Sequence, residues 1–158
     1  MIKKFVLFLA TGCGVGYLPG PQGTYGTLLA IFLYLATKDL PFYSNILFVV
    51  SFCFLAIWSA NLADRYFQEK DSGKIVIDEI AGYLVTMLAL PFDYKTVVAG
   101  FIFFRLFDIF KPFPANWCEK HLSGGFGVVC DDLVAGVYAN LCLRIILALN
   151  LWTLIPGI

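Results

Sequence analysis

Residues 46–63 read ILFVVSFCFLAIWSANLA, a run without a single charged side chain. A straight helix needs about 20 predominantly apolar residues to cross a bilayer, and this run approaches that length. Further apolar stretches occur at 27–36, 80–92, 96–107 and 133–155, and only the last of these also approaches a full crossing. The shorter stretches must use flanking residues, pair with neighbours or enter the bilayer partway. The pattern predicts an all-α, polytopic integral membrane bundle of about four to five membrane helices.

The composition agrees with a membrane protein. Of the 158 residues, 60% are hydrophobic and 14% are charged, with a mean hydropathy of +0.83. An ordinary soluble domain carries about 25% charged residues. No linker, low-complexity tract or charge run divides the chain, so we expect one membrane-embedded domain over residues 1–158. Residues 1–10 have the charged start and apolar stretch of a signal peptide, but no clear cleavage pattern follows, and we expect them to be retained.

Charge and cysteine content exclude several classes of partner. The formal net charge is zero, which argues against a nucleic-acid partner because such sites need concentrated Lys and Arg. The five cysteines include no C-x-x-C pair, so neither a disulfide framework nor a zinc site is indicated. We expect reduced, structural cysteines, and no obligatory protein partner is evident.

The basic residues indicate an orientation, because short cytoplasmic loops are enriched in Lys and Arg. If the N-terminus lies inside and all five stretches cross, eight basic residues fall on the inner side and only Lys38 and Lys95 fall outside. The same arrangement puts segments 11–26, 64–79 and 108–132, which hold nearly all the polar motifs, on the inner side. The sequence therefore predicts a polar site at the cytoplasmic face.

Paired acidic residues interrupt two apolar runs. They are Asp78-Glu79 within KIVIDEIAG (74–82) and Asp131-Asp132 within GVVCDDLVAG (127–136). Carboxylates are hard oxygen ligands, and with a single histidine in the chain they favour Mg²⁺ over zinc or copper. An alternative is that Asp78 and Asp131 cap the helices that follow them, although capping rarely requires two acids.

A third polar motif, RLFDIFKP at 105–112, places Arg105, Asp108 and Lys111 three residues apart, on one face of a helix. A helix starting at Thr96 on the outer side reaches Asp108 after roughly 18 Å of a hydrocarbon core about 30 Å thick. We therefore expect a recess below the inner surface that suits a lipid head group. Arg105 and Lys111 would neutralise a phosphate monoester there. The alternative, an ion pair between Arg105 and Asp108, is compatible with this role.

Two glycine-rich segments complete the motifs. Residues 12–27 hold six glycines before an apolar stretch, and Gly23 and Thr24 are candidate phosphate donors from backbone and side chain. A plain turn is about as good an interpretation, since no Gly-Lys-Ser/Thr follows. Residues 123–127 form a second glycine-rich turn that could let backbone approach a ligand.

The residue types present in the chain exclude several phosphatase mechanisms. The chain lacks a cysteine nucleophile followed six residues later by arginine, lacks a D-x-D motif, and has only His121 for mechanisms that need two histidines. The pattern of CDP-alcohol phosphotransferases does not fit either. Metal-assisted attack by water remains. We hypothesise that Asp78, Glu79, Asp131 and Asp132 converge from two helix starts on one or two Mg²⁺ ions, with Asp108 as a further ligand or as the base that orients water.

Together these motifs resemble the phosphatidylglycerophosphatase A family of bacterial membrane lipid phosphatases. The resemblance rests on four ordered segments, at 23–27, 75–82, 104–114 and 124–136. It implies Mg²⁺-dependent hydrolysis of the terminal phosphate monoester of phosphatidylglycerophosphate to phosphatidylglycerol in phospholipid biosynthesis. It also implies a multi-pass protein of the bacterial inner membrane whose active site faces the cytoplasm.

Two other functions stay open. One is a phosphatase for another lipid phosphate, which shares the chemistry. The other is a non-enzymatic transporter or ion-conducting subunit, because intramembrane acids also mark ion paths. A path needs polar groups through both halves of the bilayer, whereas these cluster towards one side. Arg144, within the last apolar stretch, is the main residue that does not fit, and the sequence names no partner for it.

Overall fold

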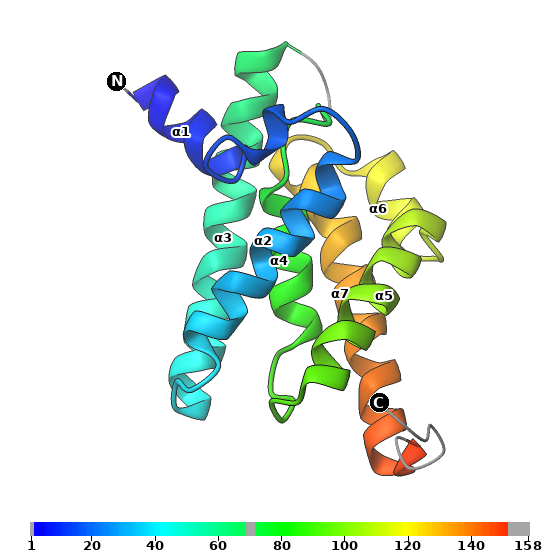
Figure 1. Cartoon of the computed structure of the whole chain (residues 1–158). Helices are drawn as coiled ribbons and strands as arrows, with labels where there is room; N and C mark the ends of the chain where they lie inside the picture. Colours follow the sequence, from blue (N-terminus) through cyan, green and yellow to red (C-terminus); the bar gives the residue numbers. More distant parts are fainter. Residues whose placement is uncertain (1, 69–71, 152–158) are drawn as a thin grey trace.

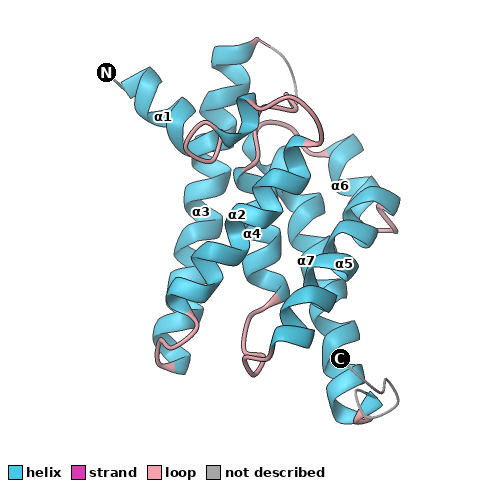
Figure 2. Cartoon of the chain, viewed as in Figure 1, coloured by secondary structure: helices cyan, strands magenta, loops and turns pink. Residues whose placement is uncertain are grey.

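The computed structural model describes residues 2–68 and 72–151. In this part of the chain the helices are joined by loops and turns, and there is no strand (Figure 2). The predicted all-α class is therefore confirmed for the described residues. The elements are α1 (Ile2–Ala10), the short 3₁₀ helix η1 (Val15–Tyr17), α2 (Gln22–Thr37), α3 (Phe42–Phe67), α4 (Ile77–Thr86), α5 (Tyr94–Phe110), α6 (Ala115–His121) and α7 (Gly125–Ala148).

Helix α4 lies at the centre of the bundle and contacts α2, α3, α5 and α7 (Figure 1). Its buried face carries large side chains such as Tyr83, which packs edge-on against Phe104 of α5 and donates a hydrogen bond from its hydroxyl to the Val97 carbonyl. Because neighbours surround it, a polar group at either end of α4 meets side chains from several other helices.

Successive long helices run in alternate directions between the two ends of the bundle (Figure 1). As a result, segments 11–21, 72–76 and 111–124 gather at one end, uppermost in Figure 1, and the connections 38–41 and 87–93 lie at the other. This is the arrangement that the basic residues predicted for the polar motifs.

Two helices, α3 and α7, are long and apolar enough to cross a membrane. Only 28% of the most apolar 18-residue stretch of α3 is buried inside the bundle, and Leu47, Phe54 and Trp58 are exposed on this helix. A core helix of a soluble protein would bury such side chains, whereas a helix in contact with lipid leaves them outward. Membrane association follows from this surface, while the predicted number of four to five crossings stays a prediction.

A close helix contact that shapes the site is between α4 and α7, at Gly82 and Gly136. A Cβ atom on Gly82 would lie 2.7 Å from the backbone oxygen of Asp132, and one on Gly136 would lie 3.1 Å from the Gly82 carbonyl carbon. Small residues let helix backbones approach this closely inside membranes. The contact brings Asp132 against the beginning of α4.

Candidate active site

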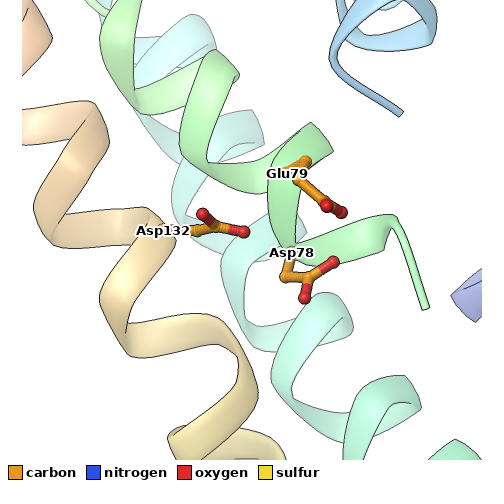
Figure 3. A group of neighbouring side chains, drawn as sticks. All are labelled: Asp78, Glu79 and Asp132. Atoms are coloured by element: carbon orange, nitrogen blue, oxygen red, sulfur yellow. The ribbon is translucent and has the colours of Figure 1, made fainter. Parts of the chain in front are cut away.

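Three carboxylates meet where α4 begins. Asp78 and Glu79 lie in the first turn of α4, and Asp132 projects from the facing side of α7 (Figure 3). One carboxylate oxygen from each residue lies within 4.8 Å of the other two, and Asp78 and Asp132 are buried. This spacing is that of ligands around a shared cation.

The start of α4 is held in place by the end of α1, the turn that follows it and the first turns of α2. Val76 donates its backbone N–H to the Ala10 carbonyl at 2.9 Å. A Cβ on Gly12 or Gly26 would lie 2.9 or 2.8 Å from the Val76 side chain, so only glycine allows this packing. Gly12 lies in a turn, as the plain interpretation of the segment expected, whereas Gly26 lies within α2.

Gly23 has a different environment, because it faces the site itself. A Cβ added there would overlap Glu79 Oε1 and lie 2.8 Å from Arg105 Nη1. The backbone of α2 therefore contacts both a cluster carboxylate and a guanidinium from α5. Thr24 lies in the same turn, half-buried, and its role towards phosphate stays a prediction.

Arg105 and Asp108 pair along the last turns of α5, with Arg105 Nη1 2.6 Å from Asp108 Oδ2. The predicted ion pair is therefore present. The same nitrogen lies nearest to the position of a Cβ on Gly23, at 2.8 Å, with Nη2 at 3.2 Å, so the guanidinium pairs with Asp108 and also lies beside Gly23, as the sequence allowed.

Lys111 joins three elements. It lies at the C-terminal end of α5, its Nζ is 2.6 Å from Asp131 Oδ2 on α7, and it is 3.3 Å from Glu119 Oε1 on α6. Burial alone would lower the pKa of Lys111, but the hydrogen bond and charge of Asp131, together with Glu119, raise it above its ordinary value. Lys111 is therefore a fixed positive charge at physiological pH.

The four acids expected around metal thus divide into two groups. Asp78, Glu79 and Asp132 form the cluster, whereas Asp131 pairs with Lys111. The expectation that both acidic pairs stand at helix starts is wrong for α7, which begins at Gly125, so Asp131 and Asp132 lie inside the helix. Capping is excluded for Asp131, while Asp78 does lie where the α4 dipole favours an acid.

The second glycine-rich turn packs against protein. Gly125 lies against the Ile57 carbonyl of α3 and donates its N–H to Asn61 Oδ1 at 3.2 Å. Asn61 thereby satisfies a free N–H at the start of α7. The expected approach of this turn to a ligand is replaced by a helix contact, which sets the depth of Asp131 and Asp132.

The site carries more negative than positive charge. The charge of Asp108 acts on Glu79, Asp131 and Asp132, so five acids share one region with Arg105 and Lys111. Glu79 Oε2, Asp131 Oδ1 and Asp132 Oδ1 are buried without a hydrogen-bond partner. Buried carboxylate oxygens need a cation or a donor. The donor set and these oxygens therefore fit a hard divalent cation such as Mg²⁺.

Three functional contacts were not visible in the sequence. Glu119 reaches Lys111 only because the chain turns back after Pro112 to form α6. Arg144 donates from Nε to Asn140 Oδ1 at 2.7 Å and from Nη2 to the Leu88 and Ala89 carbonyls. Asn140 in turn donates to the Thr86 and Leu88 carbonyls. The spacing of Asn140 and Arg144 by four residues was the one available signal.

His121 ends α6 away from these groups. It is exposed, and its ring stacks on Trp117 with centroids 4.9 Å apart. The structure thus gives the single histidine an aromatic contact within its own helix, in agreement with the solvated residue that the sequence favoured.

Comparison with known proteins gives a consistent result. The family model described as phosphatidylglycerophosphatase A matches residues 8–147. The chain is 40% identical over 131 residues to the phosphatidylglycerophosphatase A of Escherichia coli, covering 82% of this chain and 76% of the relative. The protein of that name from Haemophilus influenzae is 33% identical, covering 92% and 89%. A provisionally named phosphatidylinositol-3-phosphatase of Bacteroides thetaiotaomicron is 37% identical, covering 88% and 91%. None of the solved structures compared with the chain matches it.

Proposed function

The chain belongs to the phosphatidylglycerophosphatase A family of phosphatases, and from this premise we propose that it hydrolyses the terminal phosphate monoester of phosphatidylglycerophosphate. The products are phosphatidylglycerol and inorganic phosphate, a step of phospholipid biosynthesis. The observation that carries the proposal is the cluster of carboxylates from Asp78, Glu79 and Asp132. Arg105 lies beside this cluster, and α2 approaches both Glu79 and Arg105 with its backbone at Gly23.

Asp78, Glu79 and Asp132 would hold Mg²⁺. When bound, the cation lowers the pKa of a water ligand and offsets charge on the transferred phosphoryl group. The buried oxygens of Glu79 and Asp132 that lack a hydrogen bond support this assignment. Asp131 stays outside that set in the proposal and acts instead by fixing Lys111.

Arg105 and Lys111 bind the substrate phosphate. Arg105 has a planar guanidinium that matches two phosphate oxygens at once, and its pairing with Asp108 at 2.6 Å fixes its orientation. Lys111 is anchored between Asp131 and Glu119 and adds a point charge. Glycine at position 23 lets the backbone of α2 approach Glu79 and Arg105 closely, and the Thr24 hydroxyl in the same helical turn would donate to the bound phosphate.

Asp108 orients the attacking water. It lies on the same helix as Arg105, and its charge reaches the cluster acids, so it is near both the phosphate and the cation ligands. Water attacks phosphorus while the ester bond to glycerol breaks, and the glycerol oxygen takes up a proton. In this proposal the Asp108 carboxylate accepts a proton from the water as the new phosphorus–oxygen bond forms.

The site lies at one end of the bundle, where the basic residues gather. We propose a multi-pass protein of the bacterial inner membrane with this end at the cytoplasmic surface. In this arrangement the acyl chains remain in the bilayer beside the exposed apolar faces, and the head group would enter between α2, α4, α5 and α7, where the carboxylates and Arg105 lie.

Phosphate release by detergent-purified protein tests the proposal. We expect release from phosphatidylglycerophosphate with Mg²⁺, loss of release with EDTA, and recovery on adding Mg²⁺ back. Phosphatidylinositol 3-phosphate and phosphatidic acid serve as competing substrates, the first because of the relative from Bacteroides thetaiotaomicron. Faster release from the phosphoinositide would move the substrate assignment to that lipid. No release from any of the three lipids by folded protein would refute the proposed activity.

A further inference from the structure

Two cysteines lie in contact, each next in sequence to a residue that pairs with Lys111. Cys118 of α6 and Cys130 of α7 have their sulfur atoms 2.9 Å apart, although they are twelve positions apart in the chain. Both are free thiols in the structure. The next residue in each helix, Glu119 and Asp131, contacts Lys111, so the cysteine pair and the lysine link the same two helices at the same level.

The distance between the two sulfur atoms is close to that in a disulfide bond. A disulfide has a sulfur–sulfur distance of about 2.05 Å, so closure needs the two sulfur atoms to approach by less than about 1 Å. The neighbouring helices already pack together, and Tyr138 of α7 donates to the Phe113 carbonyl just before α6 at 2.7 Å. The two helices are therefore already held together where the bond would form.

One of the two sulfurs can be reached by a small molecule. Cys118 is 6% exposed, whereas Cys130 is half-buried and lines a surface groove whose other lining residues are Pro114, Leu133, Val134, Val137 and Tyr138. The lining is mainly apolar, which favours a small, uncharged oxidant over a charged one.

We propose that Cys118 and Cys130 are a reversible oxidation site that forms an intramolecular disulfide and links α6 to α7 next to the residues that pair with Lys111. With a small-molecule disulfide as oxidant, the Cys130 sulfur attacks first, forms a mixed disulfide and releases one thiol. The Cys118 sulfur then displaces the second thiol. Two protein thiols are oxidised, the reagent is reduced to two thiols, and these carry away both protons. The site is independent of the proposed lipid substrate.

The uncharged reagent 4,4′-dithiodipyridine tests the site on the whole protein in detergent. One equivalent should release two thiopyridones per chain, and the intact mass should fall by two hydrogen atoms. Trypsin cleaves after Lys120, between the two cysteines, so the oxidised protein should yield two peptides joined by a disulfide. Cys53→Ala, which removes a half-buried thiol elsewhere, should leave these results unchanged, whereas Cys130→Ala should abolish the linked peptides.

Stability supplies a second readout. Closing a loop of this length should raise the midpoint of thermal unfolding by about 5–10 °C, and a reductant should reverse the change. Cys118→Ala should show no rise with the oxidant. A persistent mixed disulfide on Cys130 without closure would overturn the proposal. So would resistance of both thiols in folded protein when they react in denatured protein.

Discussion

Gly23 offers the sharpest test of the site, because a single methyl group there acts on two functional side chains at once. In Gly23→Ala the new Cβ would lie 2.8 Å from Arg105 Nη1 and overlap Glu79 Oε1. Ordinary contact distances between heavy atoms are about 3.5–4.0 Å, so Arg105 must move by roughly 0.7 Å and Glu79 by more. Both are ends of flexible side chains, and their displacement leaves the helix backbone intact.

The expected effect on catalysis is large. Catalytic groups must be held within about 0.5 Å of their productive positions, and a misplacement of about 1 Å costs roughly 100-fold in rate. We therefore expect Gly23→Ala to lower kcat by about 100-fold, equivalent to about 2.7 kcal/mol of transition-state stabilisation. Stability should change little, because alanine is favoured over glycine within a helix by about 0.5–1 kcal/mol.

The assay is Mg²⁺-dependent phosphate release from phosphatidylglycerophosphate, with thermal unfolding of the same samples. Gly73→Ala is the matched control, since a Cβ at Gly73 meets nothing within 4 Å and should leave kcat unchanged. Turnover of Gly23→Ala within twofold of the unmodified protein would refute the reasoning, because Glu79 and Arg105 would then tolerate a displacement that the proposed site forbids.

Three further substitutions separate the parts of the site. Asp132→Asn removes a charged ligand and should lower phosphate release by at least about 100-fold, with a higher Mg²⁺ requirement in a titration; an unchanged requirement would contradict its role. Lys111→Met should abolish phosphate release and lower the free energy of unfolding by about 1–3 kcal/mol in a denaturant titration, because the carboxylate of Asp131 stays buried without its cation. Adding Asp131→Asn should restore stability but not activity. Arg144→Ala should lower the unfolding free energy by about 1–3 kcal/mol while kcat stays within twofold, and a selective loss of kcat would contradict its structural role.

Much of the site followed from the sequence because its chemistry is unusual for a membrane protein. Ionisable groups such as Asp78 and Asp132 are costly among apolar residues, so their presence alone pointed to a site. Spacings of three residues correctly predicted the Arg105–Asp108 pair, since one helix fixes that geometry. The assignment of Asp131 was different: its distance from the cluster depends on where α7 begins and on how α6 folds back, and neither is a local property.

Helix ends were the least predictable feature for a related reason. The run at 80–92 looked like one apolar stretch, but α4 ends at Thr86 and an irregular segment follows. The glycines at 82 and 136 bring α4 against α7, and the position of that contact fixes which side chains face the end of α4. The sequence gives the identities of these residues, whereas their pairing depends on the packing of helices distant in the chain.

The end of α4 also accounts for Arg144, the residue that had favoured an ion path. A helix of ten residues spans about 15 Å, half the thickness of a hydrocarbon core, so in the proposed multi-pass arrangement its last carbonyls fall where water is scarce. Unsatisfied backbone groups there are costly. Asn140 and Arg144 donate to the carbonyls of Thr86, Leu88 and Ala89, which makes them a cap for a short helix. The short helix in turn places Asp78 and Glu79 at one surface. In the proposed function the polar residues in the two halves of the bundle therefore have separate roles, the proposed reaction site at one end and a helix cap towards the other. The cap removes the main observation in favour of transport.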